Sequence, residues 1–548
     1  MPKEPTMTTS NDLPATQHAV QLVAPDQLRI NPSKEVSRPG PYQLLAKIEC
    51  VGLCFSDLKL LKQFDQHARK SEVVRGLSAD VLKEIPSYVP GTKPTVPGHE
   101  VTCRIVAVGE KVKHHKVGER CLVQTDYRNL PTAGSNSAFG YNFEGALQEY
   151  VLMDERVVID SDGERFLIPV PEDLSASAIA LVEPWACVED SYVTEERQHV
   201  LPGGKMLVVV EPGHAEQGID GLTLVHKPSE LRRVTPVEID TVANESIDDC
   251  VYFGSNKATI DKLNDKLATR GIMNVVLGGK SIGAPVSLGV GRVHYGLTRW
   301  IGTTGNDPAE SYRRIPRTGE LRENDSVLVV GAGGPMGQMH VIRTVCSGIK
   351  GLRIVGTDMD DARLASIASK ANPLAQAAGI PLTMVNTAKT PLVGKFSYIA
   401  LMAPVGKLVA DAVRDSDAGA LINIFAGIPA TVKQDIDLDT YIAKGCYMFG
   451  TSGSTIRDMK IVLQKVVQRR LDTNTSVDAV SGMKGAPDGI AAVEKRTLAG
   501  KIIVYPQLHE LPLTPLVELP TKFPTVAAKL DHGKWTREAE QELLRVAR

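Results

Sequence analysis

The stretch "DSVLVVGAGGPMGQMHVIRTVCSGIKGLRIVGTDMD", residues 325–360, decides how this chain is interpreted. An apolar run enters a glycine-rich turn, a helix-like segment follows, and a second apolar run ends at Asp358. Glycines let the backbone turn tightly and approach a pyrophosphate, and the free N–H groups at the start of the next helix attract that anion. The stretch therefore predicts a Rossmann-type dinucleotide-binding unit.

The glycine pattern is GxGGxxG, and the strand before it and the helix after it supply the context that a glycine motif needs. A carboxylate at the end of the second strand would accept hydrogen bonds from the adenosine ribose hydroxyls and repel a 2′-phosphate. The pattern therefore favours NAD over NADP. The candidate cofactor residues are Gly331, Gly333, Gly334, Pro335, Met336, Gly337 and Asp358.

The rest of the chain divides by pattern into a β-rich part and an α/β part. Residues from about 40 to 160 read as short strands separated by Gly, Pro and Asp, which is typical of a small all-β domain. From about 205 onward, buried strands alternate with helical segments, as in a parallel sheet. With 548 residues, the chain is long enough for about three or four domains.

An internal repeat lies within the α/β part. Residues 248–279 can be laid against 396–427, "RWIGTTG" against "YMFGTSG", and "KMLVVVEPG" (205–213) against "SVLVVGAGG". We interpret this as two tandem nucleotide-binding-type domains, with a chance match of common α/β patterns as the alternative. The first copy has Glu211 and Pro212 where glycines are needed, so we expect residues 205–320 to bind no dinucleotide in the standard way.

Composition excludes several classes of function. The chain is 43% hydrophobic with a net charge of -2, which gives no electrostatic basis for binding nucleic acid or an anionic membrane. No apolar run reaches the length of a membrane span, and the N-terminal "MPKEPTMTTSNDLPATQ" lacks the apolar core of a signal peptide, so we expect a cytoplasmic protein. Eight cysteines in so long a chain are not a disulfide framework.

Three further motifs carry candidate metal ligands: "VGLCFSDLKLL", "PTVPGHE" and "LVEPWACVED". In this order, and followed by the Rossmann unit, they make the chain resemble the zinc-dependent medium-chain alcohol and polyol dehydrogenases. The resemblance covers about 40–200 and 320–508 and includes the strand phrases "VGERCLVQ" and "EGALQEYV". The wording "GAGGPMGQMH" is most similar to the sugar-phosphate branch of that family, which includes L-sorbose 1-phosphate reductase.

The resemblance implies an α/β fold: a GroES-like β-rich catalytic domain plus a Rossmann domain, here with an inserted, degenerate second Rossmann-like domain. We expect the catalytic domain at 1–200, the insertion at 201–320, the NAD-binding domain at 321–470, a return segment at 471–508 and a tail at 509–548. The family normally lacks the insertion, which we expect to extend a subunit interface or to cover the cleft. In the tail, Thr536 is a candidate N-cap, and Glu538 and Glu540 place negative charge near the start of a helix.

The resemblance also implies one catalytic zinc ion per chain. Cys54 and His99 are the expected ligands and act in catalysis, Glu100 is a ligand or a close neighbour of one, and Glu183 is a further ligand, with Cys187 as its rival. Ser56 would carry the alcohol proton outward. Asp57 is expected to be structural or to support the metal ligands without binding the ion. The family's four-cysteine zinc lobe is absent, because "PTAGSNSAFGYNF" contains no cysteine.

Two groups of basic residues are less specific. The extra sequence at 63–92 borders the expected cleft, and its His67, Arg69, Lys70 and Arg75 either meet a substrate phosphate or carboxylate or are solvated surface charge. His114 and His115 are expected at the surface, in a turn between strands.

The sequence therefore predicts a zinc enzyme that transfers hydride between NAD and a secondary alcohol or ketone of a polyol, sugar or sugar phosphate. One alternative is transient oxidation by a tightly held NAD that serves epimerisation or elimination, and a second is a binding protein that kept the fold. By resemblance we expect a homodimer or homotetramer.

Overall fold

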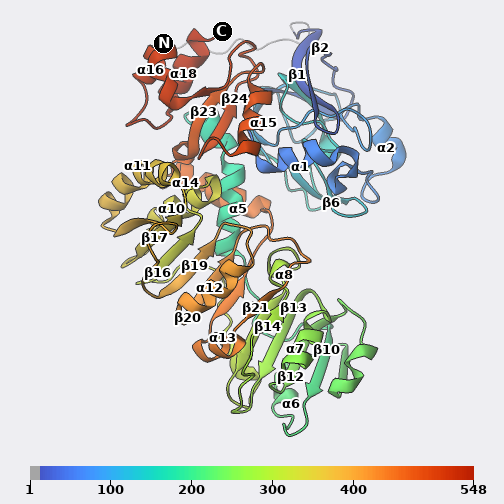
Figure 1. Ribbon diagram of the computed structural model, residues 1–548. Helices are drawn as coiled ribbons and strands as arrows, with labels where there is room; N and C mark the ends of the chain where they lie inside the picture. The colour runs from blue at the N-terminus through green and yellow to red at the C-terminus, as the bar shows by residue number, and fades with distance from the viewer. Residues whose placement is uncertain (1–12) are drawn as a thin grey trace. The chain divides into compact units, whose positions relative to one another are not determined.

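The computed structural model describes residues 13–548 of the chain (Figure 1). Most of the N-terminal segment on which the signal-peptide prediction rests, residues 1–12, lies outside the described residues. Within 13–548, no helix combines the length and the apolar character that a membrane span needs. The chain divides into two compact units, Met1–Ala186 with Ser454–Arg548 (unit 1) and Cys187–Gly453 (unit 2).

Unit 1 is built on a mixed eight-stranded sheet in the order β25-β23-β24-β3-β4-β5-β9, with β8 also paired to β3. Strand β24, from the C-terminal part of the chain, pairs antiparallel with β3, Ile503 opposite Gly52, so the two ends of unit 1 share one sheet. The strands are β3 (Gln43–Gly52), β4 (Glu100–Val108), β5 (Arg120–Val123), β8 (Tyr150–Asp154), β9 (Leu167–Pro169), β23 (Val477–Ser481), β24 (Lys501–Val504) and β25 (Thr514–Pro515), with the hairpins β1 (Thr16–Ala24) and β2 (Gln27–Glu35), and β6 (Asp126–Pro131) and β7 (Asn136–Ala138).

Short helices surround this sheet. They are α1 (Phe55–Gln63), α2 (Ala79–Lys83), α3 (Glu155–Val158), α4 (Ala176–Ala180), α14 (Ile456–Val467), α15 (Ala486–Lys495), α16 (Leu519–Lys522), α17 (Pro524–Ala527) and α18 (Arg537–Val546), while α5 (Val182–Val193) runs across the boundary between the units. No disulfide joins any of the eight cysteines, all of which lie among the described residues.

The C-terminal helix α18 begins where the sequence predicts, because the Thr536 side chain accepts a hydrogen bond from the Ala539 N–H. Glu538 and Glu540 lie in its first turn, as predicted. Glu540 has a further role: its buried carboxylate accepts the N–H groups of Ala176 (2.7 Å) and Ser177 (2.9 Å), so it also caps α4. Two orphan donors at the start of α4 are thereby satisfied by the tail.

Unit 2 contains the predicted Rossmann sheet. Its six parallel strands run in the order β18-β17-β16-β19-β20-β22, the doubly wound arrangement that opens a crevice between the first and fourth strands. The strands are β16 (Ser326–Val330), β17 (Arg353–Asp358), β18 (Leu382–Asn386), β19 (Phe396–Leu401), β20 (Ser416–Ile424) and β22 (Tyr447–Phe449); Figure 1 draws them beside α10 (Pro335–Val345), α11 (Asp361–Ala378), α12 (Lys407–Asp415) and α13 (Leu438–Lys444).

A second parallel sheet in unit 2 repeats this order without the outermost strand: β11-β10-β12-β13-β15. Its elements are β10 (Lys205–Val210), α6 (Ile219–Thr223), β11 (Glu230–Val234), β12 (Ile247–Phe253), α7 (Lys257–Asn264), β13 (Leu267–Val276), α8 (Val290–Tyr295), β15 (Arg299–Thr303) and α9 (Ala309–Arg314). The fold class is therefore confirmed. The finer domain boundaries, 201–320 among them, stay a prediction.

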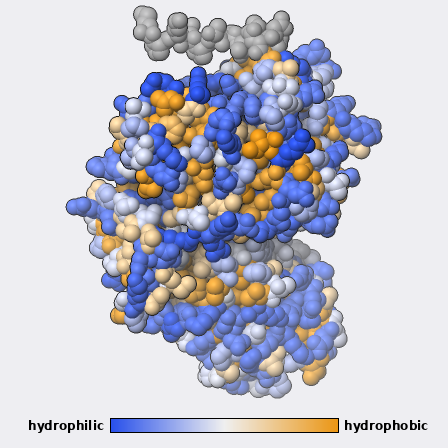
Figure 2. All heavy atoms as spheres, turned by 45° about the horizontal axis from the view of Figure 1, so that its top comes forward, coloured by the Kyte–Doolittle hydropathy of each residue, from blue (hydrophilic) through white to orange (hydrophobic). Residues whose placement is uncertain are grey.

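The described surface is mixed in polarity. On the face that Figure 2 shows, hydrophilic residues spread widely and hydrophobic ones gather in separate patches between them. The two adjacent histidines of the strand-connecting turn differ from the prediction. His114 is exposed as expected, but His115 is buried and its Nδ1 lies 2.9 Å from Glu155 Oε1. Burial lowers the pKa of His115.

Candidate metal and cofactor sites

Cys54 stands at the N-terminal cap of α1, in the turn between β3 and that helix. Its backbone N–H donates to Asp57 Oδ2 (3.0 Å), which fixes the turn, and its Sγ lies 3.2 Å from Ser56 Oγ. Because the cap residue is extended while the helix begins immediately after it, the thiol stands at the mouth of the helix rather than along its side.

His99 is held by the same carboxylate. Asp57 Oδ1 accepts the Gly98 N–H (3.2 Å) and lies 3.0 Å from His99 Nδ1. A carboxylate on Nδ1 places the proton there and leaves Nε2 free as a ligand. Burial lowers the pKa of His99, but Asp57 holds it well above its usual value. Asp57 thus supports both candidate ligands, through the Cys54 N–H and the His99 ring.

Glu100 opens strand β4 and is fully buried. Its Oε1 accepts a hydrogen bond from the buried Lys501 ammonium, whose Nζ also donates to Leu53 O (2.8 Å). Its Oε2 is buried and has no hydrogen-bond partner among the described residues. An unpaired oxygen of a buried carboxylate is costly, unless a cation completes it.

These three side chains converge. One ligand atom each of Cys54, His99 and Glu100 lies within 4.8 Å of the others, the spacing of a shared metal ion. A thiolate, an imidazole and a carboxylate are ligands that zinc accepts, and they leave one tetrahedral position open. The residues therefore fit a zinc ion, and the unpaired oxygen of Glu100 is the strongest sign of it.

The further ligand predicted on α5 stands apart from this group. Glu183 is buried and lies close enough to His99 and Glu100 to interact with both charges, yet it is not among the three converging side chains. Burial raises the pKa of Glu183 to about 7, with His99 opposing and Glu100 adding to that change. Cys187, one turn further along α5, is not in the group either.

The extra loop at 63–92 is folded against this site. Lys70 is fully buried, and its ammonium donates to Lys93 O (2.8 Å) and Val89 O, so it closes the loop and is neither a phosphate ligand nor surface charge. Burial lowers its pKa to about 7. Arg69 pairs with Asp126 (3.3 Å) and lies 5.9 Å from the centroid of the Tyr141 ring.

Tyr141 connects the loop with the metal ligands. Its ring centroid is 5.0 Å from that of His67 and 5.9 Å from that of His99. His67 accepts a hydrogen bond from the Arg69 N–H through Nδ1, and burial lowers its pKa to about 4. The Tyr141 ring therefore lies near both Arg69 and His99. Arg75, from the same loop, is exposed.

The glycine-rich turn has the geometry that a dinucleotide needs. Gly331 adopts a left-handed φ of +83°, and a Cβ on Gly337 would lie 2.1 Å from Gly331 O, so both positions require glycine. Gly334 caps α10 and Pro335 is its first residue. Asp358 Oδ2 accepts the Gly333 N–H (3.1 Å), so the acid at the end of β17 lies against the turn, and Met336 follows in the first turn of α10.

In the first copy, side chains bond to one another at the position that corresponds to the glycine-rich turn. Glu211, directly after β10, accepts hydrogen bonds from Tyr252 (2.7 Å) on β12 and from Thr259 (3.1 Å). Strand β11 was not foreseen from the sequence. Its register against β10, in which Val210 is equivalent to Val330, puts Pro236 where the cofactor-binding copy has Asp358. The Glu211 carboxylate would repel a pyrophosphate, and Pro236 offers no carboxylate to a ribose.

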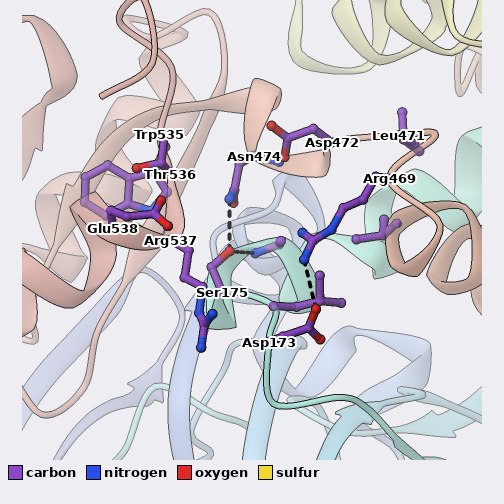
Figure 3. A pocket seen from close by; sticks show the side chains of 13 residues that line it. Asp173, Ser175, Arg469, Leu471, Asp472, Asn474, Trp535, Thr536, Arg537 and Glu538 are labelled. Carbon is purple, nitrogen blue, oxygen red and sulfur yellow. Dashed lines mark hydrogen bonds and ion pairs between the residues drawn. The ribbon is translucent and has the colours of Figure 1, made fainter. Parts of the chain in front are cut away.

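Two other features of unit 1 lie away from these residues. His18, Glu149 and His509 also bring ligand atoms within 4.8 Å, but all three are partly exposed, and Glu149 Oε2 already accepts the His18 N–H (2.9 Å). A cavity of about 400 Å³ opens between the segment before α4, the end of α14 and the start of α18. There Arg469 points to Asp173 (2.9 Å) and Asn474 to Ser175 (2.9 Å), as Figure 3 shows, so these four polar side chains already have partners.

Comparison with known proteins identifies the class. Residues 40–162 match the alcohol dehydrogenase GroES-like domain. This match, the candidate metal-ligand motifs and the Rossmann sheet together make the chain similar to the medium-chain alcohol and polyol dehydrogenases.

Among characterised relatives, mannitol-1-phosphate 5-dehydrogenase of Aliivibrio fischeri is 28% identical over 248 residues, which are 41% of this chain and 57% of that protein. L-sorbose 1-phosphate reductase of Klebsiella pneumoniae is 24% identical over 310 residues, 48% of this chain and 70% of that protein. The crystal structure of 2R,3R-butanediol dehydrogenase from Bacillus subtilis is similar in fold, with a TM-score of 0.53 at 15% identity over 90% of this chain and 100% of that one. The chain thus spans little more than half the length of the first of these relatives.

Proposed function

We propose that this chain is a zinc-dependent oxidoreductase that transfers hydride between NAD(H) and a secondary alcohol or ketone of a polyol, sugar or sugar phosphate. One observation carries the proposal. The buried Glu100 carboxylate keeps an unpaired oxygen beside a thiol and an imidazole, in a chain that also has a glycine turn with an acid against it.

The proposed roles follow from the contacts. Cys54, His99 and Glu100 would hold zinc, and Glu183 would stand close by as a further ligand or through water. Such an ion would supply a Lewis acid for the substrate oxygen, and NAD held at the glycine turn would accept the hydride. Asp57 keeps the His99 ring oriented, and Ser56, on the first turn of α1, takes the alcohol proton outward.

The cofactor and substrate class rest on different residues. Asp358 supports NAD, since its carboxylate would repel the 2′-phosphate of NADP. For the substrate, Arg69 supports a phosphorylated sugar or polyol, because its guanidinium lies 5.9 Å from the centroid of the Tyr141 ring, which is itself 5.9 Å from that of His99. A cytoplasmic location and one zinc ion per chain stay predictions.

The test is NADH formation by the zinc-loaded protein across polyols, sugars and sugar phosphates, with NAD and NADP in parallel. We expect one substrate class to give many turnovers with NAD, and Cys54→Ser to abolish them. NADH that stops at one equivalent per chain would contradict the proposal and indicate a retained cofactor. No turnover with zinc and NAD both bound would refute the substrate class.

A further inference from the structure

From β12 and β19 onward, the two nucleotide-binding-type folds of unit 2 are copies in a constant register. Equivalent positions lie 148 residues apart, from Asp248 and Phe396 at the start of the repeat to Gly302 and Gly450 near its end. Even an uncommon backbone conformation is repeated, since Leu297 has a φ of +54° and its equivalent, Gly445, a φ of +62°. The two copies therefore share their backbone conformation in the region that follows β12 and β19.

The two copies meet through equivalent strands. β14 (Val286–Leu288) and β21 (Gln434–Ile436) pair antiparallel, with Val286 opposite Ile436 and Leu288 opposite Gln434. Because equivalent residues are 148 positions apart, Val286 corresponds to Gln434 and Leu288 to Ile436, so exchanging the two copies converts one of these pairs into the other. The central pair, Ser287 with Asp435, is converted into itself. This is the pairing that a two-fold axis through the central pair produces, here within one chain.

The contacts around this axis are reciprocal. A Cβ on Gly302 would lie 2.7 Å from the Ile442 side chain, and a Cβ on the equivalent Gly450 would lie 3.1 Å from Cα of His294, which is the equivalent of Ile442. In both halves, a glycine on the last strand or directly after it lets the helix of the other copy approach closely.

A second reciprocal set lies at the helix starts. The Asp439 carboxylate accepts the N–H of Ile282 (2.8 Å). The equivalent of Asp439 is Gly291, and a Cβ there would lie 3.0 Å from Cα of Ala430, the equivalent of Ile282. When residue i contacts j, and the equivalent of i contacts the equivalent of j, the interface is isologous.

Equivalent side chains also form one shared core. Leu288 and Ile436, Val290 and Leu438, and Trp300 and Met448 are at most 1% exposed, and all belong to a single apolar cluster built from both copies. The Tyr441 hydroxyl donates to Trp300 O across the contact (2.7 Å). Such continuous burial is typical of permanent interfaces.

We propose that residues 205–320 occupy, in the same chain, the surface of residues 326–453 that a second identical copy would fit. The chain is then a covalently joined pseudo-dimer with one cofactor turn, because the first copy fills its own crevice with Glu211. The insertion replaces a subunit contact rather than extending one. A homodimer or homotetramer has to use another surface.

Paired cysteines test this in the full-length protein. Ser287 and Asp435 face each other at the axis, and both side chains reach solvent. A true dimer through β21 would set position 435 against position 435 of the other chain. We would therefore make Ser287→Cys, Asp435→Cys and the double variant, oxidise each together with the unchanged chain, and analyse them by non-reducing gel and peptide mass spectrometry.

We expect the double variant to form a disulfide between positions 287 and 435 within a single 59.1 kDa chain, independent of protein concentration. We expect Asp435→Cys alone to stay unlinked at that position. An interchain link in the single variant, an interchain link in the double variant, or no link in a folded double variant would each overturn the proposal. None of these outcomes depends on zinc, NAD or turnover, so the result is separate from that of the proposed function.

Discussion

Gly52→Ala tests the metal site through a residue that binds nothing. Gly52 pairs with Glu100 across β3 and β4, and a Cβ there would lie 2.1 Å from Glu100 Oε2. Since real Cβ atoms essentially never come within 3.0 Å of another atom, the oxygen has to retreat by about 0.9 Å. Metal–ligand distances hold to within about 0.2 Å, so Glu100 can no longer ligate in place.

We expect zinc affinity to fall about 100-fold, or about 2.8 kcal/mol. The fold should survive, because Gly52 does not have a left-handed φ and added core volume costs about 1–3 kcal/mol. Chelator competition measures the zinc dissociation constant, and urea denaturation followed by tryptophan fluorescence reports the fold.

The matched control is the same substitution in a Glu100→Ala background. If the added methyl acts through the carboxylate, Gly52→Ala costs almost no further zinc affinity once the carboxylate is gone. Unchanged zinc affinity in Gly52→Ala would refute the reasoning, and so would an equal loss in both backgrounds.

Three other predictions concern the cofactor, the substrate and the metal count. Asp358→Ala should lower kcat/KM with NAD about 10- to 100-fold, from the loss of charged hydrogen bonds, and lower it less with NADP; an unchanged ratio between the two cofactors would show that this acid does not choose between them. Arg69→Leu should lower kcat/KM about 10- to 100-fold for a sugar phosphate and little for the unphosphorylated sugar, with Arg75→Leu as the exposed control from the same loop; equal losses on both substrates would exclude phosphate recognition. Elemental analysis should find one zinc ion per chain, none in Cys54→Ser and still one in His509→Ala, and a second ion that His509→Ala removes would show that the prediction of one zinc is wrong.

Helices and strands could be predicted where the residues that determine them are neighbours in the sequence. The strand–glycine–helix stretch at 325–360 predicted β16, α10 and β17, and Thr536 predicted the start of α18. Strand β11 was missed because "ELRRV" carries two arginines at the edge of its sheet and lacks the apolar run of a central strand. His115 was placed at the surface because nothing local reveals Glu155, its partner 40 positions away.

The candidate ligands could be predicted from the sequence where they stand within short motifs. Cys54 and His99 stand in short phrases, and Asp57, three residues after Cys54, holds both. Lys501 was not predictable, because it meets Glu100, 401 positions earlier in the chain, only through the antiparallel pairing of β24 with β3. Tyr141 was missed for the same reason: its nearness to His99 is a product of tertiary packing, and its surroundings in sequence are those of an ordinary turn.

The repeat shows which constraints survived in the first copy. Its strands, helix starts and close-packed glycines keep a register of 148 positions wherever the two copies touch, because a shift by one residue would break both members of each reciprocal contact. Its first turn meets no such partner, and there the register is lost: Glu211 and Pro212 replace the glycine turn, and five-residue α6 stands where the other copy has the eleven residues of α10. A domain retained for binding a dinucleotide would show the opposite pattern: its glycine-rich first turn would be preserved, and the surface that contacts the other copy would have changed. The first copy is therefore better explained by the surface it covers than by a ligand it holds.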